Sequence, residues 1–189
     1  MKTFAFAATA ALLLSGCAAG LKAAQPGNYA AKVMTVPLQQ SWSVADSKYQ
    51  GAQRANFTKD GFGLNQLSLV LIEEGHDMKP GKDKSEEPVN YEPGMSQLDM
   101  VEFMQASLAA IGYTAVEVSN VAPAQFVGQS GITMDLSGKY ETGLNLRGVA
   151  SMAETDQGLA VGFFVAPSRF YFDRDAAEAR AALAGARLR

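Results

Sequence analysis

The first seventeen residues constrain how the rest of the chain can be held together. Lys2 precedes an apolar run over residues 4–14, and the single cysteine of the sequence, Cys17, follows this run. An apolar run of about eleven residues is shorter than the ~17 to 25 needed to span a bilayer, and it is typical of a secretory signal peptide. Without a second cysteine the domain has no internal disulfide, so packing and hydrogen bonds have to stabilise it.

The four residues that end at Cys17, Leu-Ser-Gly-Cys, resemble the lipobox of bacterial lipoproteins, in which small residues precede an acylated cysteine. The resemblance implies that residues 1–16 are removed and that Cys17 becomes a lipid-modified N-terminus. It also implies the outer membrane, on its periplasmic side, because Ala18 and not an aspartate follows the cysteine. The lipid is the predicted membrane anchor, since no later apolar run approaches the length of a span.

The mature chain has the composition of one acidic globular domain. The full sequence has 16 basic and 19 acidic residues, and removal of Lys2 with the leader leaves 15 against 19, a charge of −4. This balance gives no basic field for nucleic acid. We expect residues 17–28, which are mostly small or turn-forming, to be a flexible tether and residues 29–189 to form a single domain.

Alternating apolar residues and turn signals predict a sheet rich in hairpins. Asp60-Gly61 separates extended segments at residues 49–58 and 64–73, and a second turn at residues 154–158 joins two later strands. The other strands are expected at residues 31–36, around Trp42, and at 113–118, 130–136, 144–152 and 159–166. Between residues 74 and 93 the chain is charged and interrupted by proline and glycine, which predicts a long solvated loop, either a mobile excursion or a contact surface.

Two helices complete an α+β fold. Ser96 and Asp99 have the spacing of a capping box for a helix over residues 96–110, and Asp173 is a predicted N-cap for a helix over residues 175–188. Two helices against a mainly antiparallel sheet define the class. The predicted core pairs one sheet face with one helix face, formed by Leu67, Leu69, Leu71, Val161, Phe163 and Val165 and by Leu98, Val101 and Leu108.

Residues with catalytic potential are few. His76, the one histidine, lies in the charged loop, and a metal site there would lack a second imidazole. Ser130 lies in Gly-Gln-Ser-Gly-Ile, where the glycine required two positions after a serine nucleophile is replaced by Ile132. Four carboxylates at strand ends and turns, Asp135, Glu141, Glu154 and Asp156, are more typical of solvated charge than of catalysis. We therefore predict no enzyme, no metal and no cofactor.

The segment from Met95 to Leu183 looks like an uncharacterised family of proteobacterial lipoproteins. Its order is a helix, a strand, the run from Pro123 to Gly131, a strand pair, and Phe170-Tyr171-Phe172 before a closing helix. More remotely, this order is similar to the PsbP and Mog1 group of α/β/α sandwiches. That resemblance implies an accessory or binding role, and it carries over no functional residue.

We interpret the chain as a lipid-anchored periplasmic accessory or binding protein that acts by contact with an envelope protein. Aromatic and arginine side chains anchor many interfaces, which makes Trp42, Tyr91, Arg169 and Tyr171 the candidates. One alternative is a carrier or sensor of a small apolar ligand, indicated by the methionines near residues 95–104. Another is a hydrolase that acts through carboxylates. A ligand-sized pocket would favour the first, and carboxylates converging in it the second.

Overall fold

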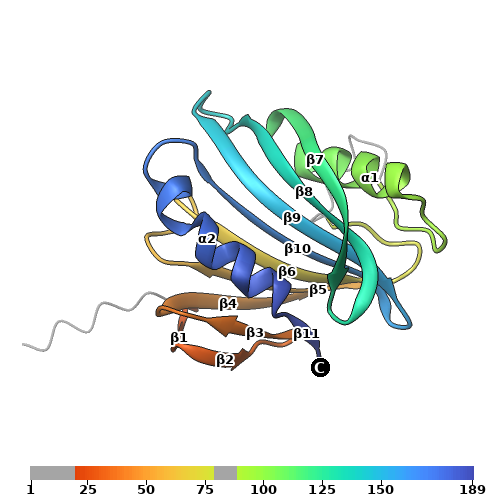
Figure 1. Cartoon of the computed structure of the whole chain (residues 1–189), viewed down its shortest axis with the longest axis horizontal. Helices are drawn as coiled ribbons and strands as arrows, with labels where there is room; N and C mark the ends of the chain where they lie inside the picture. The colour runs from red at the N-terminus through yellow and green to blue at the C-terminus, as the bar shows by residue number, and fades with distance from the viewer. Residues whose placement is uncertain (1–19, 79–88) are drawn as a thin grey trace, which may run out of the picture.

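The computed structural model describes residues 20–78 and 89–189, which form an α+β fold with two helices and a mainly antiparallel sheet (Figure 1). The fold class predicted from the sequence is confirmed. In chain order the elements are β1 Lys22–Ala24, β2 Gly27–Ala30, β3 Met34–Leu38, β4 Trp42–Tyr49, β5 Ala52–Thr58, β6 Gln66–Ile72, α1 Gln97–Ala110, β7 Thr114–Phe126, β8 Gln129–Lys139, β9 Asn145–Thr155, β10 Gly158–Pro167, α2 Tyr171–Ala184 and β11 Arg187–Leu188.

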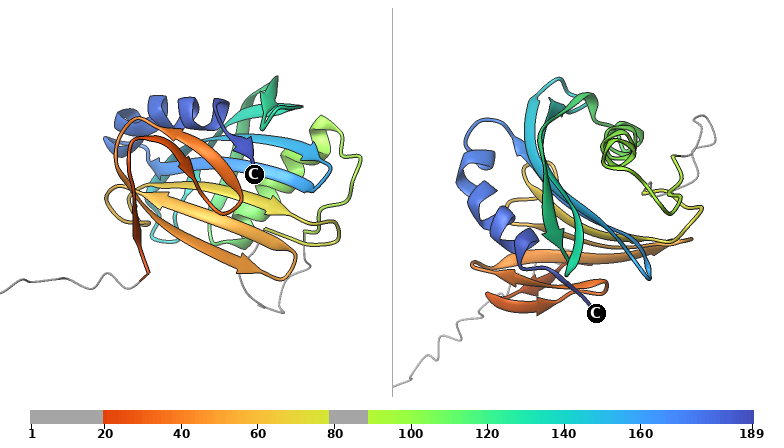
Figure 2. Two further views of the ribbon diagram at one scale, coloured as in Figure 1. Left: turned by 90° about the horizontal axis from the view of Figure 1, so that it is seen from below. Right: turned by 45° about the vertical axis from the view of Figure 1, so that its right-hand side comes forward.

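The strands form two sheets and the whole fold is layered. Eight strands make one antiparallel sheet in the order β1-β4-β5-β6-β10-β9-β8-β7, and a smaller sheet has the order β11-β3-β2. Helix α1 covers one face of the large sheet, whereas α2 and the small sheet cover the other (Figure 2). The result is an α/β/α sandwich. Within the described ranges, no helix is long and apolar enough to cross a membrane.

Both predicted hairpins are present. Phe57 of β5 lies opposite Leu67 of β6, and in the loop between them Gly61 has φ 115°, a conformation that glycine adopts without strain. A two-residue connection joins β9 to β10. A further hairpin was not predicted as one: β7 and β8 extend beyond the expected strands and meet at Val127-Gly128, where both residues have positive φ.

Two cores lie on opposite faces of the large sheet, which corrects the predicted single core. In the register between β6 and β10, Leu69 lies opposite Gly162, and directly opposed residues share a face. The predicted strand residues therefore separate, with Leu67, Leu69 and Leu71 in the α2 core and Val161, Phe163 and Val165 in the α1 core. The error arose because β6 and β10 are apolar on both faces. The alternation of side chains along each strand therefore does not show which residues of the two strands lie on the same face of the sheet.

Helix α1 begins as predicted but turns a different face to the sheet. The amide of Asp99 donates to Ser96 Oγ at 3.2 Å, and the amide of Ser96 donates to Asp99 Oδ2 at 2.8 Å, which completes the capping box. Leu98, predicted to be in the core, is 64% exposed. The buried residues are Met100, Phe103, Met104, Ser107 and Leu108. Helix α1 carries apolar residues on several of its sides. A buried face rotated by one position therefore fits the helical spacing of apolar residues equally well.

Three predicted boundaries are wrong. The tether prediction fails from Lys22 onward, because β1 pairs with β4 and its small Ala24 packs opposite Trp42 in the core. Residues 31–36, predicted as one strand, contain a turn between β2 and β3. Helix α2 begins at Tyr171, before Asp173, and ends at Ala184. Strand β11 then pairs with β3, so the helix does not span residues 175–188.

Candidate interaction surface

A cluster of buried charges lies beneath the first half of α2. Lys59 Nζ is 3.0 Å from Asp175 Oδ1 and 2.6 Å from Glu178 Oε2, and both carboxylates are buried. The other oxygen of Glu178 accepts from the amides of Gln39 and Gln40 at 3.0 and 2.9 Å and from Trp42 Nε1 at 3.1 Å. Buried ions are tolerated where they are paired and hydrogen-bonded, as they are here. The cluster fixes α2 to the β3–β4 and β5–β6 loops.

Arg174 continues this cluster to the surface. Its guanidinium donates to both oxygens of Asp175, at 2.9 and 2.7 Å, and forms an ion pair with Asp60. Asn65 Nδ2 links the same two carboxylates, at 2.6 Å from Asp60 and 3.1 Å from Asp175. The loop over residues 59–65 is thereby tied to the start of α2.

The charges around these carboxylates hold them ionised. Burial by itself would raise the pKa of Asp175, but hydrogen bonds from Arg174 and Lys59 outweigh it, and its pKa is lowered. Burial likewise opposes ionisation of Glu178, whose pKa is lowered by hydrogen bonds from Lys59 and Trp42. The hydrogen bond from Arg174 is the main reason for the lowered pKa of Asp60. These carboxylates are fully engaged in holding the fold together, which is unlike the free, raised-pKa acid that catalysis would need.

The turn into α2 pushes a large apolar side chain into solvent. Phe170 has φ 65° and ψ −66°, and the amide of Tyr171 donates to the Arg169 carbonyl at 2.8 Å, which is the geometry of a γ-turn with positive φ. A non-glycine residue in such a conformation is strained, and strain of this kind concentrates at functional sites. The side chain of Phe170 is 65% exposed.

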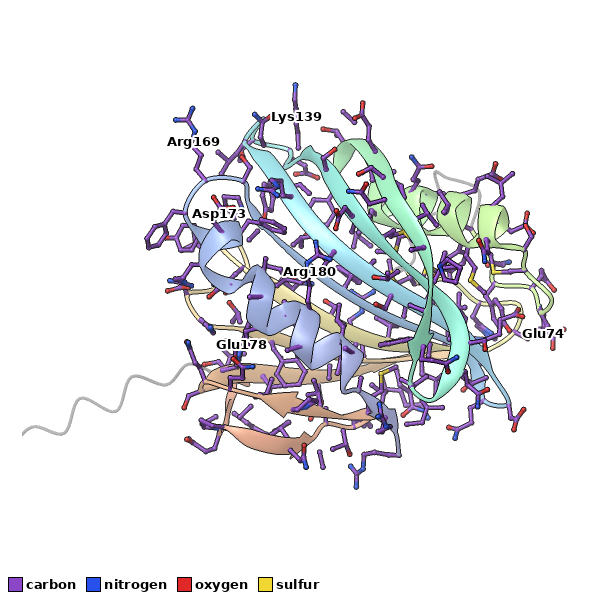
Figure 3. The ribbon with its side chains drawn as sticks, in the orientation of Figure 1. Glu74, Lys139, Arg169, Asp173, Glu178 and Arg180 are labelled. Carbon is purple, nitrogen blue, oxygen red and sulfur yellow. The ribbon has the colours of Figure 1, made fainter. Side chains whose placement is uncertain are left out.

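Cationic and aromatic groups surround Phe170. The Arg174 guanidinium lies 5.4 Å from the centre of the Phe170 ring and 5.3 Å from that of Tyr171, and the two rings meet edge to face at 5.1 Å. Arg169 is exposed, and Figure 3 shows it projecting away from the ribbon. We call Arg169, Phe170, Tyr171 and Arg174 the α2-entry surface.

The β8–β9 loop adjoins this surface. The amide of Ser168 donates to the Asn145 carbonyl at 3.0 Å, and Arg147 forms an ion pair with Asp173 at 3.1 Å. In the β8–β9 loop Leu144 is 52% exposed, and Lys139, the last residue of β8, is exposed and projects outward from the ribbon (Figure 3). Apolar and cationic side chains from two separate segments are therefore brought together.

Comparisons with known proteins identify the fold. No protein-family model and no curated protein sequence matches the chain. The solution structure of cyanobacterial PsbP (CyanoP) from Synechocystis sp. PCC 6803 is similar with a TM-score of 0.55 and 15% sequence identity, over 93% of this chain and 96% of that chain. The fold resembles that of PsbP. The crystal structure of LpqN, involved in cell envelope biogenesis of Mycobacterium tuberculosis, has a TM-score of 0.36 and 10% identity, over 92% of this chain and 87% of that chain.

The PsbP-like sandwich predicted from the sequence is thus confirmed as a fold. Of the four predicted interface residues, Arg169 and Tyr171 lie on the α2-entry surface. Trp42 and Tyr91 are each 2% exposed, so their prediction as surface anchors is wrong. The indole of Trp42 donates to Glu178, and the Lys59 ammonium lies 4.8 Å from the centre of its ring. Aromatic residues with a polar atom are as suited to such buried bonds as to interfaces.

Tyr91 belongs to a clasp at the other end of the molecule. One oxygen of Glu154 accepts from Tyr91 Oη at 3.2 Å and from the amides of Gly94 and Met95 at 2.7 and 3.2 Å. Burial, with the adjacent Glu154 charge, raises the pKa of Tyr91 to about 12. The amide of Tyr91 also donates to the His76 carbonyl at 2.8 Å. These bonds anchor both sides of the charged loop, of which residues 79–88 lie outside the described part.

The residues considered for chemistry are dispersed. His76 Nδ1 is 2.9 Å from the Glu74 carbonyl, whereas Ser130 Oγ accepts from Gln125 at 3.2 Å in the β7–β8 hairpin. Among the carboxylates, Asp135 pairs with Arg180 at 2.5 Å and Glu154 forms the clasp. In residues 20–78 and 89–189, no group of three histidine, cysteine or acidic residues is placed to hold a metal ion.

Sequence reasoning did not identify the buried ion cluster. The sequence feature that indicates the cluster is a pair of acids on the apolar face of an alanine-rich helix. Asp175 and Glu178 are three residues apart and lie on the same helix face as Phe172 and Ala182. The partner Lys59, more than a hundred residues earlier, has no local signal of this kind.

Proposed function

We propose that this chain is a lipid-anchored accessory or binding protein of the cell envelope that acts by contact and not by catalysis. The observation that carries this proposal is Phe170, a 65% exposed aromatic side chain that a strained γ-turn holds outside the fold. Burying an exposed phenylalanine side chain is favourable by ~1.5 to 3 kcal/mol. A binding partner that covers Phe170 would gain this free energy. The buried ion cluster beneath α2 keeps the turn in place.

The anchor in this proposal is an acyl group on Cys17, attached after removal of residues 1–16. Cys17 lies outside the described residues, and the lipobox-like sequence before it supports the assignment. The outer membrane and its periplasmic side follow as the proposed location from Ala18. A Cys17→Ser variant should lose membrane retention in a fractionation experiment, and retention at the wild-type level would contradict the anchor.

Two occupants fit the α2-entry surface: an envelope protein, as predicted from the sequence, and the lipid bilayer. Arginine and aromatic side chains are enriched in the centres of protein interfaces and also at membrane surfaces. In either case the function is binding, and Arg169 and Phe170 supply the charged and apolar contacts.

The experiment is photocrosslinking in intact cells. A photoreactive amino acid replaces Phe170 in one variant and Leu98 in the other, and the matched exposures of these side chains, 65% and 64%, make the second a control. We expect position 170 to capture an envelope component and position 98 to capture none. Combining the probe at 170 with His76→Ala and Ser130→Ala should leave the adduct unchanged. Equal labelling at 170 and 98, or loss of the adduct in that triple variant, would contradict a contact function through this surface.

A further inference from the structure

Exposed apolar side chains gather at one end of the molecule. Seven large hydrophobic residues are exposed within residues 20–78 and 89–189, and five of them come from the residue before β1, the β5–β6 loop, the β8–β9 loop and the α2 turn, namely Leu21, Phe62, Leu64, Leu144 and Phe170. The first described residues, the β5–β6 loop and the start of α2 lie at the same end of the long axis in both Figure 1 and the left view of Figure 2. We call this the anchored end.

The distance from the anchor to the fold is short. Only residues 18–21 separate Cys17 from Lys22, where β1 begins. An extended chain spans at most about 3.3 to 3.6 Å per residue, so Lys22 lies within roughly 17 Å of an acylated Cys17. This step relies on the lipid anchor of the proposed function. A domain held that closely cannot leave the membrane surface, and the end nearest the anchor has to face it.

The far end of the molecule is the more acidic of the two ends, which would orient the domain in the same way. At or beside the anchored end Arg169, Lys139 and Lys22 are exposed together with the acids Asp60, Glu141 and Asp173, and 73% of the Lys22 side chain is accessible even though Asp46 lies 3.9 Å away. The far end carries exposed Glu73, Glu74, Glu92 and Asp156, with Glu74 labelled opposite Arg169 in Figure 3. Lys48 is an exposed basic residue on that side. Anionic headgroups attract basic residues and repel acidic ones over about a Debye length.

We propose that the anchored end rests on an anionic bilayer, with Phe170 and Leu144 inserted into the headgroup region and Arg169 and Lys139 paired with lipid phosphates. A bilayer suits this arrangement better than a protein does. The apolar side chains project from separate loops, whereas a protein interface concentrates its energy in a packed central cluster. A fluid interface accepts isolated apolar side chains flanked by cations.

The chain is well suited to a site-specific fluorescence test. Its single cysteine is the proposed acylation site, so a cysteine introduced elsewhere is the one free thiol of the lipidated protein. Leu144→Cys and Leu98→Cys variants are labelled with the fluorophore NBD and reconstituted into phosphatidylcholine vesicles containing phosphatidylglycerol and a lipid-borne quencher. We expect a blue-shifted and quenched signal at position 144 and no quenching at position 98.

Further substitutions connect the signal to the proposed contacts. Phe170→Ser should abolish quenching at position 144. Arg169→Ala should reduce the ratio of docked to undocked protein about fivefold on anionic vesicles, as expected for one basic residue near the surface, and should have no effect on vesicles of phosphatidylcholine alone.

The outcomes separate this inference from the proposed function. Mass spectrometry of the N-terminal peptide comes first, and a Cys17 without an acyl group would overturn the anchor and the inference together. If Cys17 is acylated, an unquenched position 144 or equal quenching at 98 overturns the inference alone. Protection of position 144 in native membranes but not in protein-free vesicles would identify a protein as the occupant, and this also overturns the bilayer assignment.

Discussion

At each end of the molecule one glutamate oxygen accepts three hydrogen bonds and so holds a loop in place, but one of these glutamates is buried and the other lies close to solvent. At the anchored end Glu178 Oε1 accepts three hydrogen bonds in the interior, with Lys59 as its counter-ion. At the far end Glu154 Oε1 also accepts three, close to solvent and without an ion pair among the described residues. The difference shows that an acid can organise a loop alone at the surface, whereas a buried acid needs a cation to offset its desolvation.

Removal of that cation should have the largest effect. Lys59→Met leaves Asp175 and Glu178 buried without a partner, and breaking a buried pair on one side costs ~3 to 5 kcal/mol. Lys48→Met, an exposed lysine at the end of β4, is the control and should change stability by less than ~0.5 kcal/mol. Urea unfolding of both variants measures this, and equal midpoints would mean that the ion cluster does not stabilise the fold.

The two acids should themselves differ. Glu178→Gln removes charge from the buried cluster and should lower the free energy of unfolding by roughly 2 to 3 kcal/mol, because Lys59 loses one of its two carboxylates. Glu154→Gln keeps an acceptor at the surface and should cost about 1 kcal/mol. A ranking in the reverse order, measured by thermal unfolding, would show that the far-end clasp is the stronger of the two.

The ends should also respond to opposite extremes of pH. Asp60, Asp175 and Glu178 have lowered pKa values, so their stabilisation is complete above the unfolded values near 4 and is lost as pH falls through the folded ones. Tyr91 has a raised pKa of about 12, so its contribution is complete below the unfolded value near 10 and is lost as pH rises through 12. Tyr91→Phe should reduce the alkaline loss, of which a part remains because burial also raises the pKa of Tyr113 and Tyr140, and should leave the acid loss intact, as measured by circular dichroism across the pH range.

The smallest effect concerns the strained turn. Phe170→Gly relieves a positive φ and should raise the free energy of unfolding by roughly 0.5 to 1 kcal/mol while removing the exposed ring. Leu98→Gly, at an exposed position inside α1, should instead lower it by about 1 kcal/mol. If Phe170→Gly destabilises the protein, the turn serves the fold and its exposure has no functional meaning.

Beyond the fold class, what the sequence predicted correctly was local. The Asp60-Gly61 turn and the Ser96 capping box depend on neighbouring residues, and both are present. The assignment of Leu98 to the core failed because α1 is apolar on several sides. The match between the faces of β6 and β10 failed because the register that pairs Leu69 with Gly162 depends on contacts far apart in the chain.

The candidate site was predictable in part for the same reason. Arg169 and Tyr171, the two predicted residues that lie on the α2-entry surface, were chosen by residue type, since arginine and tyrosine are common at contact surfaces. Phe170, beside them, was missed because its exposure follows from a backbone conformation that composition does not encode. Trp42 was misassigned because its buried partner Glu178 lies 136 residues away.

The pairing of β11 with β3 has a consequence for the order in which this protein can fold. Strand β3 begins at Met34, which pairs with Leu188, and this pairing completes the small sheet. Structures dominated by such distant pairings form slowly, because a long loop has to close before the contacts can stabilise it. A chain delivered from its N-terminus would therefore have an incomplete small sheet until Arg187 and Leu188 arrive.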